Sequence, residues 1–338
     1  MRNLKPDRIF LAACCSLFSV LAFAQDIHFS QFHETPLYRN PAMAGIMKGD
    51  IRIQTVFRSQ WNSFANAYKS GSFNAEYKLP VAGDDYLTLG MQVLYDRAGT
   101  IDMRQTHVLP VVNYHKSLSA DRNMYLSAGF MGGLVQRRFD PSKMTTNSQY
   151  DGMGTGEVFA ATSHSYWDGS AGLTFNSGLG RNPENNMVVG VAYHHFNRPK
   201  QSFYNDPRIA VDAKWVFSAD LRFAVTEYTT MTLHSDHMRQ GPHSSTMAGV
   251  FYGVKFGPLT DEPDYIISGG AFMRWNDAVI PTLKLDYRPF AVSLSYDVNI
   301  SELKTTSYGR GGYELSLVYS GFLDRENTSR NAVRCPVF

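Results

Sequence analysis

Cysteine is scarce in this chain of 338 residues, which contains only three. Cys14 and Cys15 lie in an apolar stretch near the N-terminus, and Cys335 lies close to the C-terminus. If the N-terminal stretch is a leader that is removed, one cysteine remains. A single cysteine excludes an intramolecular disulfide and a zinc site built from cysteines.

An excess of charge of either sign is also lacking. The chain has 32 basic and 30 acidic residues, and without residues 1–24, which hold Arg2, Lys5, Arg8 and Asp7, it has 29 of each. This balance argues against a nucleic-acid partner and against electrostatic steering of a charged substrate. After residue 24 no uninterrupted apolar run approaches about 20 residues, so we expect no membrane-spanning helix there.

The N-terminus has the pattern of a secretory leader. Basic residues precede an apolar run over residues 9–21, and Ala22-Phe23-Ala24 forms a small-x-small cleavage site. We therefore predict a signal peptide over residues 1–24 and a mature chain outside the cytoplasm. A lipoprotein signal ending at Cys14 is the alternative, but the apolar run before Cys14 is short and continues well past it.

Alternation of apolar and polar residues with a period of two dominates the chain from about residue 50 to residue 320. In residues 211–225, VDAKWVFSADLRFAV, one face is apolar throughout and the other carries the charges; residues 166–176 and 290–300 divide in the same way. Turn-like stretches separate about fourteen such segments of roughly ten residues, the length that a tilted strand needs to cross a bilayer. We predict an all-β fold, a transmembrane antiparallel β-barrel of about 14 strands.

A soluble β-sandwich or a large soluble barrel is the alternative fold. Strands of sandwiches are shorter, usually five to six residues. Aromatic residues also recur near the ends of the predicted strands, as in the interfacial girdles of membrane barrels. These residues are Tyr95, Tyr114, Tyr193, Phe256, Trp275, Tyr287 and Tyr319.

The segment QFHETPLYRNPAMAG, residues 31–45, fits no long regular element, because prolines interrupt it. The lumen of a barrel of about fourteen strands is too wide to be filled by the side chains of its own strands. At the depth of the membrane, irregular backbone is tolerated only inside such a lumen. We therefore predict that residues 25–48 form a hatch in the lumen of a barrel over residues 49–321, which a C-terminal tail over residues 322–338 follows. The alternative to the hatch is a flexible N-terminal tail outside the membrane. The predicted hatch residues are Phe29, Phe32, Tyr38, Arg39, Asn40 and Pro41.

Charged residues on the predicted inward faces are expected to pair with one another or with the hatch. Plugged barrels are polar inside, so the expected role of this network is structural. Its predicted members are Arg58, Asp212, Asp220, Arg222, Arg274 and Glu314.

Candidates for catalysis or metal binding are weak. His234 and Asp236 share one face of a strand and His237 points the other way, so three ligands do not converge. His194 and His195 should likewise face opposite sides. His243 and Ser244 lie in a predicted loop and suggest a hydrolase. No acidic residue stands at a spacing that would complete a catalytic triad, and no Gly-x-Ser-x-Gly nucleophile elbow is present. We expect no enzymatic activity, no metal and no cofactor.

Residues 139–165 form the longest irregular insertion. It is too long for a hairpin turn and too aromatic for a linker, so either it binds a partner or it folds back on the rim of the barrel. The candidate partner-binding residues are Met144, Tyr150, Met153 and Phe159.

Several stretches together resemble the PorP/SprF family, outer-membrane components of the type IX secretion system of Bacteroidetes. They are QDIHFSQFHETPLYRNPAMAG at the predicted mature N-terminus, RSQWNSF at 58–64, FDPSKMTTNSQYDG at 139–152, FMRWNDAVIPTLKLDY at 272–287, SYDVNISELKTTSYGRGGYELSLVY at 295–319, and the terminal RCPVF. The family's usual ending resembles Cys-Pro-Arg-Phe, whereas Val337 stands here in place of the Arg. Asn40-Pro41-Ala42 is also similar to a turn in the hatch of long-chain fatty-acid transporters, which are fourteen-stranded barrels.

The resemblance implies a non-enzymatic role in the outer membrane of a Gram-negative bacterium. Its implied partners are periplasmic ring or motor proteins of the secretion system, a large secreted or surface-adhesin protein, and outer-membrane lipid. It also implies a part in protein secretion and gliding motility, by binding, anchoring or helping to export the secreted partner. The alternative is a transporter of hydrophobic small molecules or a porin-like channel.

Overall fold

The computed structural model describes residues 26–60, 68–150, 152, 156, 160–204, 206, 208–260, 262–301 and 309–323. Several features predicted from the sequence lie outside these residues. They are the leader over residues 1–24, Met153, Phe159, Cys335 and the C-terminal tail beyond residue 323.

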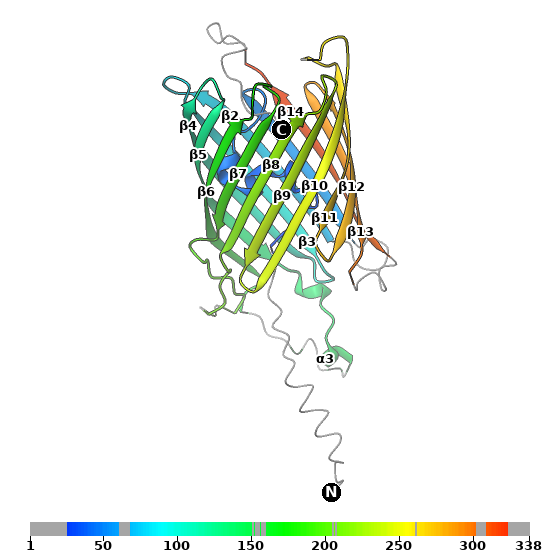
Figure 1. Cartoon of the computed structure of the whole chain (residues 1–338). Coiled ribbons are helices and arrows are strands. Elements are labelled where there is room, and N and C mark those ends of the chain that lie inside the picture. Colours follow the sequence, from blue (N-terminus) through cyan, green and yellow to red (C-terminus); the bar gives the residue numbers. More distant parts are fainter. Residues whose placement is uncertain are drawn as a thin grey trace.

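Fourteen antiparallel strands form a closed barrel in which each strand pairs with its neighbours in the sequence, and β1 pairs with β14 to close the ring (Figure 1). The predicted fold class is therefore confirmed. The strands are β1 (Ile51–Gln60), β2 (Tyr68–Pro80), β3 (Tyr86–Ala98), β4 (Met103–Ser119), β5 (Met124–Arg138), β6 (Ser163–Gly178), β7 (Asn186–His194), β8 (Lys214–Ala224), β9 (Thr229–Gln240), β10 (His243–Phe256), β11 (Tyr265–Arg274), β12 (Ala278–Tyr287), β13 (Phe290–Asn299) and β14 (Arg310–Gly321).

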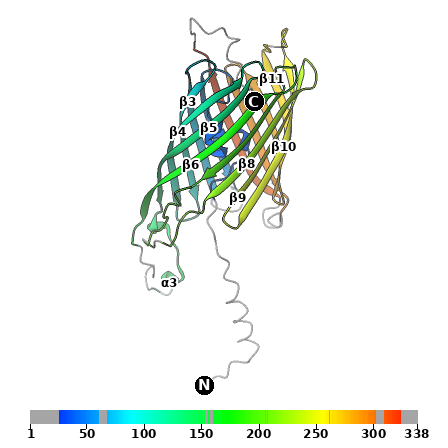
Figure 2. The same ribbon diagram turned by 60° about the vertical axis from the view of Figure 1, so that its left-hand side comes forward.

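The strands vary in length more than expected, from 9 residues in β7 to 17 in β4. The long strands β4, β5 and β6 are neighbours, and they extend the wall toward α3 (Asn147–Tyr150) (Figure 2). The other short helices are η1 (Phe32–Glu34), α2 (Pro36–Arg39), η2 (Pro41–Met43) and η3 (Pro141–Lys143). No helix of the described residues is long and apolar enough to span a membrane.

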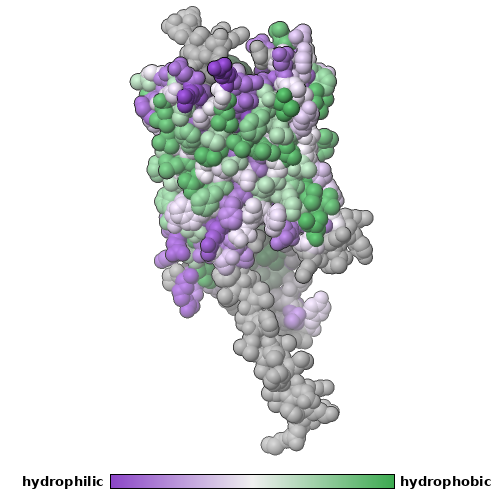
Figure 3. Space-filling model, in the orientation of Figure 1, coloured by the Kyte–Doolittle hydropathy of each residue, from purple (hydrophilic) through white to green (hydrophobic). Residues whose placement is uncertain are grey.

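The two faces of each strand meet different surroundings. In β8, Trp215 and Phe217 point outward and are 45% and 50% exposed, whereas Lys214 and Asp220 point inward and are buried. On the face shown in Figure 3, a broad apolar band consequently crosses the middle of the barrel, with hydrophilic residues toward both ends. Of the aromatic residues expected near the ends of the belt, Tyr95, Tyr114, Phe256, Trp275 and Tyr287 are exposed, while Tyr193 and Tyr319 are half-buried.

The two ends of the barrel differ. One end, the short-turn end, holds the turns 81–85, 120–123 and 288–289; the other, the long-loop end, holds the connections 139–162 and 195–213. In outer-membrane barrels short turns face the periplasm and long loops face outward. The sequence predicts an outer-membrane barrel, and in such a barrel the long-loop end corresponds to the cell exterior.

Candidate functional site

Residues 26–50 run through the interior of the barrel from the long-loop end to the short-turn end (Figures 1 and 2). Asp26 pairs with Lys214 at the start of β8, and Asp50 hydrogen-bonds Gly321 at the end of β14. Between them the chain makes only short helical turns. Pro36 and Pro41 each occupy a first helical turn, where the missing N–H is harmless.

Residues from all fourteen strands contact this N-terminal segment. Polar contacts come from β1, β2, β4, β6–β9 and β11–β14, and apolar contacts come from β3, β5 and β10 among others. The segment thus spans the full cross-section of the described barrel.

A buried ion cluster on β1, β11, β13 and β14 holds the first part of the segment. Arg58 donates to Glu314 at 2.7 Å and to Asp297 at 3.1 Å, and Arg274 donates to Asp297 at 3.0 Å. The Glu314 carboxylate then accepts both backbone N–H groups of Ser30 and Gln31, at 2.6 and 2.7 Å. Since charge-assisted bonds of this kind are strong and directional, the cluster fixes the backbone of the segment and not only a side chain.

Arg39 makes the most extensive ionic contact of the segment. Its guanidinium forms paired bonds with Asp220 on β8, both at 3.0 Å, and with Asp236 on β9 at 2.6–3.0 Å. Arg39 is only 5% exposed, and the ring of Phe32 lies 5.2 Å from its guanidinium carbon. The two carboxylates are therefore held together by one buried cation.

The turn at Asn40 and Pro41 packs against a part of the wall that lacks side chains. The Asn40 amide donates to the backbone oxygens of Leu173 and Val191 and to Thr174 Oγ1, at 3.1–3.2 Å, and its oxygen accepts from Ala42 N. A Cβ at Gly172 would lie 1.9 Å from Asn40 Oδ1, and one at Gly129 would lie 2.4 Å from the Pro41 carbonyl carbon. Glycine is required at both positions because the segment approaches the strand backbone closely.

The end of the segment is held by β2 and β4. Asn113 donates to the carbonyl oxygens of Ala42 and Ala44 at 2.8 Å, and His115 Nε2 bonds the Ala44 oxygen at the same distance. Glu76 accepts from Gly45 N at 2.9 Å. The backbone polar groups of this irregular stretch are thus satisfied by inward side chains, as membrane depth demands.

Apolar side chains of the segment also lie in separate niches of the wall. Phe32 packs edge-on to Phe272 with ring centroids 5.6 Å apart, and Phe29 packs with Val56 and Leu94. Phe29 and Phe32 are 2% and 4% exposed. Burial of each phenylalanine stabilises the seated segment by about 1.5–3 kcal/mol.

The long-loop end of the segment is held by a third ionic group. Asp26 pairs with Lys214 at 2.6 Å and with His195 at 2.9 Å, and Lys214 donates to the Tyr38 hydroxyl at 3.2 Å. The cavity beside these residues has a volume of only about 20 Å³, room for about one water molecule.

His194 and His195 do not face opposite sides, contrary to the prediction. Strand β7 ends at His194, and His195 has a left-handed backbone (φ 56°) that turns its side chain back toward Asp168. Both imidazoles are consequently buried: His194 bonds the carbonyl oxygen of Arg39, and His195 bridges Asp168 and Asp26.

Two of the predicted network residues lie elsewhere than expected. Asp212 precedes β8, is half-buried, and accepts from Gln240 through its backbone oxygen. Arg222 lies toward the short-turn end, where the nearby acids are Glu184 and Asp286, away from the Arg58 and Arg39 clusters. Sequence reasoning missed Asp297 and the pairing role of Asp236.

The candidate metal and catalytic residues do not form a centre. His234 bonds Asp220 at 2.8 Å, while His237 lies on the outer face and bonds Thr246. Ser244 belongs to β10 and not to a loop, since β10 begins at His243. In the described part of the chain no group of three or more His, Cys, Asp or Glu side chains is placed to hold a metal ion.

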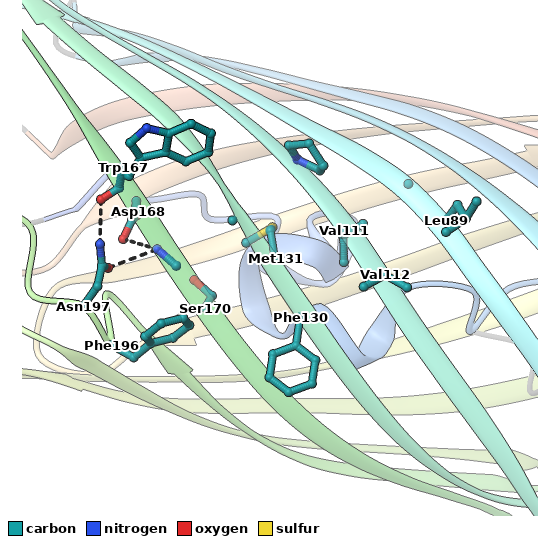
Figure 4. Close-up of a pocket in the computed structure, with 14 residues that line it drawn as sticks. Leu89, Val111, Val112, Phe130, Met131, Trp167, Asp168, Ser170, Phe196 and Asn197 are labelled. Carbon is teal, nitrogen blue, oxygen red and sulfur yellow. Dashed lines mark hydrogen bonds between the residues drawn. The ribbon is translucent and has the colours of Figure 1, made fainter.

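The outer wall has a depression where β7 falls short of β6. Phe130, Trp167 and Phe196 line it together with other mostly apolar side chains, and its volume is about 740 Å³ (Figure 4). Asn197 continues the wall in place of a strand, because its side chain bonds the Trp167 oxygen at 2.7 Å and Gly169 N at 3.1 Å. The depression opens on the apolar face of the barrel, and no residue of the N-terminal segment is among those that line it.

The connections at the long-loop end pack on one another. Phe139 lies edge-on to Phe203 with centroids 5.0 Å apart, and Ala161 N donates to the Phe203 oxygen at 3.2 Å. Of the candidate partner-binding residues, Met144 is half-buried and Tyr150 is 87% exposed. The predicted loop is shorter by three residues, because β6 begins at Ser163.

The closed barrel with its outer apolar belt defines an outer-membrane β-barrel protein. The chain belongs to the family described as type IX secretion system membrane protein PorP/SprF, whose model matches residues 21–319. No curated protein sequence matches the chain.

Several solved structures are similar to the chain at low sequence identity. The toluene transporter TodX of P. putida has 10% identity and a TM-score of 0.52, over 86% of this chain and 94% of TodX. The toluene transporter TbuX of Ralstonia pickettii has 8% identity and a TM-score of 0.49 over the same shares. The translocator domain of the autotransporter NalP from Neisseria meningitidis has 9% identity and a TM-score of 0.42, over 80% of this chain and 88% of that domain. Identities this low concern the fold alone.

Proposed function

We propose that this protein is a sealed binding platform of the type IX secretion system. Residues 25–48 act as a hatch, and the loops at the outer end of the barrel bind or anchor a secreted partner, such as a large adhesin of the gliding machinery. The short-turn end meets periplasmic ring or motor proteins. This role requires neither enzymatic chemistry nor a cofactor.

The observation that carries the proposal is the occupied lumen. The N-terminal segment contacts every strand, through buried ion pairs, hydrogen bonds or apolar packing. A secreted polypeptide cannot pass beside such a segment, because the charged groups would lose their buried partners. A partner must therefore bind outside the lumen.

The loops of the outer end supply a surface suited to that partner. Asp140 N donates to the Ile101 oxygen at 2.9 Å, so the 139–162 connection is attached to the β3–β4 turn as well as to Phe203. Tyr150 and Tyr204 remain 87% and 53% exposed. Tyrosine on an ordered surface is a frequent anchor in protein interfaces.

The alternative function is a transporter. It is supported by the similarity to a toluene transporter, but that similarity concerns the fold alone. A transporter needs an apolar passage through the barrel. The groups that flank the N-terminal segment are largely ionic and amide groups.

The proposal is tested by purifying the tagged protein from gently solubilised outer membranes and identifying co-purifying proteins by mass spectrometry. We expect a secreted protein and ring components at stoichiometric levels. Substituting both Tyr150→Ala and Tyr204→Ala should lower the secreted protein about tenfold or more while ring components remain.

The matched control is Tyr228→Ala, because Tyr228 is also 53% exposed but lies in the turn between β8 and β9 at the opposite end. It should leave the secreted protein bound. Recovery of the barrel alone, or with a bound hydrophobic molecule, would favour the transporter.

A further inference from the structure

Four basic residues form one row across the outer wall at the long-loop end. Lys69 on β2 is directly opposite Arg97 on β3, Arg97 is opposite Arg104 on β4, and Arg104 is opposite Arg138 on β5. Each lies within two residues of the end of its strand. With strands about 4.8 Å apart, the row is about 14 Å long.

The row points away from the lumen. Side chains alternate along a strand, so residues an even number of positions apart share a face. On each of the four strands, one such residue on the same face as the cation is 39–46% exposed: Phe73, Tyr95, Val108 and Leu134. The apolar row that crosses the same strands through Phe73, Val108 and Leu134 lies four residues away, about 13 Å. The cations therefore lie at the outer edge of the lipid-facing belt.

Acidic partners are too few to balance the row. Asp102 in the β3–β4 turn pairs with Arg97, Arg104 and Lys143 of the adjacent loop, and Asp140 lies 3.8 Å from Lys143. Hydrogen bonds from Arg104 and Lys143 hold the pKa of the Asp102 carboxyl well below its usual range, so Asp102 stays charged. Among the described residues Lys69 and Arg138 have no ion pair, so five cations face two carboxylates.

Like charges directly opposite each other on neighbouring strands destabilise a sheet. An anion beside the row removes that repulsion, and arginine forks match the oxygens of a phosphate group. Because the row faces sideways above an apolar surface, its occupant must present phosphate and acyl chains together. This description fits a lipid of the outer leaflet better than a soluble anion or an acidic protein.

We propose that Lys69, Arg97, Arg104 and Arg138 form a binding site for the phosphate groups of a phosphorylated glycolipid in the outer leaflet, with its acyl chains on the apolar surface of β2–β5. The site is independent of the partner surface at the loop tips. It fixes the depth of the barrel in the membrane, and with it the height of the loops above the lipid.

The test is a binding titration of the purified full chain in a non-ionic detergent, with diphosphoryl lipid A as the probe and native mass spectrometry as the readout. The variant is Lys69→Gln with Arg138→Gln, because these two cations have no ion pair among the described residues and their loss should not disturb folding. We expect the variant to bind about tenfold more weakly. Two further probes, dephosphorylated lipid A and inorganic phosphate, are titrated into the unmodified protein at the same concentration. Each should bind only as weakly as diphosphoryl lipid A binds the double variant.

The matched control is Arg239→Gln. Arg239 is exposed on the outer face of β9 near the same end, but its cross-strand neighbours are Trp215 and Ser244, so it belongs to no basic row. It should bind lipid A within twofold of the unmodified protein. Unchanged binding by the double variant, in a barrel that still shifts its electrophoretic mobility on heating, would overturn the proposal. The proposal would also be overturned if dephosphorylated lipid A, inorganic phosphate alone or an acidic protein bound the unmodified protein as strongly as diphosphoryl lipid A does.

Discussion

Replacing Arg39 with methionine is expected to lower the free energy of unfolding by about 3–5 kcal/mol, because it leaves two buried carboxylates without their cation. Asp220 and Asp236 are 3% and 1% exposed, and both depend on the guanidinium of Arg39. Methionine retains the length and apolar contacts of the arginine stem, so the loss reports the charge. Urea unfolding in detergent or lipid vesicles measures it.

The matched control for Arg39→Met is Arg208→Met. Arg208 also forms paired bonds with an aspartate, Asp206, but its side chain is 88% exposed. The loss there should be within about 1 kcal/mol. Hydrogen exchange of residues 30–46 gives a second readout: these amides should lose protection in Arg39→Met and keep it in Arg208→Met. Equal effects of the two substitutions would contradict the assignment of Arg39 as an anchor of the N-terminal segment.

Replacing Gly172 with valine is expected to displace the segment at Asn40 and to destabilise the protein by about 2–4 kcal/mol. The added Cβ would lie 1.9 Å from Asn40 Oδ1, so the amide must leave its bonds to Leu173, Thr174 and Val191. Valine is favoured in strands, so a loss of stability cannot come from strand propensity. Unfolding and hydrogen exchange again provide the measurement.

Gly269→Val is the control for that substitution, because a Cβ at Gly269 on β11 meets only Leu283, at 3.8 Å. It should be neutral or slightly stabilising. A partial recovery is expected when Gly172→Ala is combined with Asn40→Ala, since the second change removes the atom that clashes. If Gly172→Val and Gly269→Val behaved alike, the close approach of the N-terminal segment to β6 would be refuted.

The barrel could be predicted from the sequence because lipid and lumen impose opposite demands on alternate residues. In β8 every second side chain from Trp215 to Phe223 is apolar and the others include Lys214, Asp220 and Arg222, so the two faces are evident without any structure. Strand lengths were less predictable. Strands β4 to β6 run past the ten residues that a bilayer requires, and the pattern does not show where they stop.

The partners inside the lumen could not be predicted, because they depend on closure and register. Alternation assigns Arg58, Arg274 and Asp297 to the inward face, but only the closed barrel brings β1, β11 and β13 around Ser30. The glycines that receive Asn40 and Pro41 have no local signal, since the contacts join residues far apart in the chain: Asn40 meets Gly172, and Pro41 meets Gly129.

Local backbone conformation accounts for the errors near strand ends. Counting by twos places His194 and His195 on opposite faces, but the left-handed φ of His195 follows the end of β7 and turns its side chain to the inner side as well. Asp212 was counted as part of a strand that begins only at Lys214. The assignment of alternate residues to opposite faces is valid only where the strand is continuous.

The most direct test of the central claim, that the N-terminal segment closes the barrel, is the ionic conductance of the purified protein in planar lipid bilayers. The full chain should be silent, and a variant that lacks residues 26–46 but still folds, as judged by heat-dependent mobility, should form steady open channels, since a fourteen-stranded barrel is too wide for its own side chains to fill. A steadily conducting full chain, or a folded deletion variant that stays silent, would contradict the account.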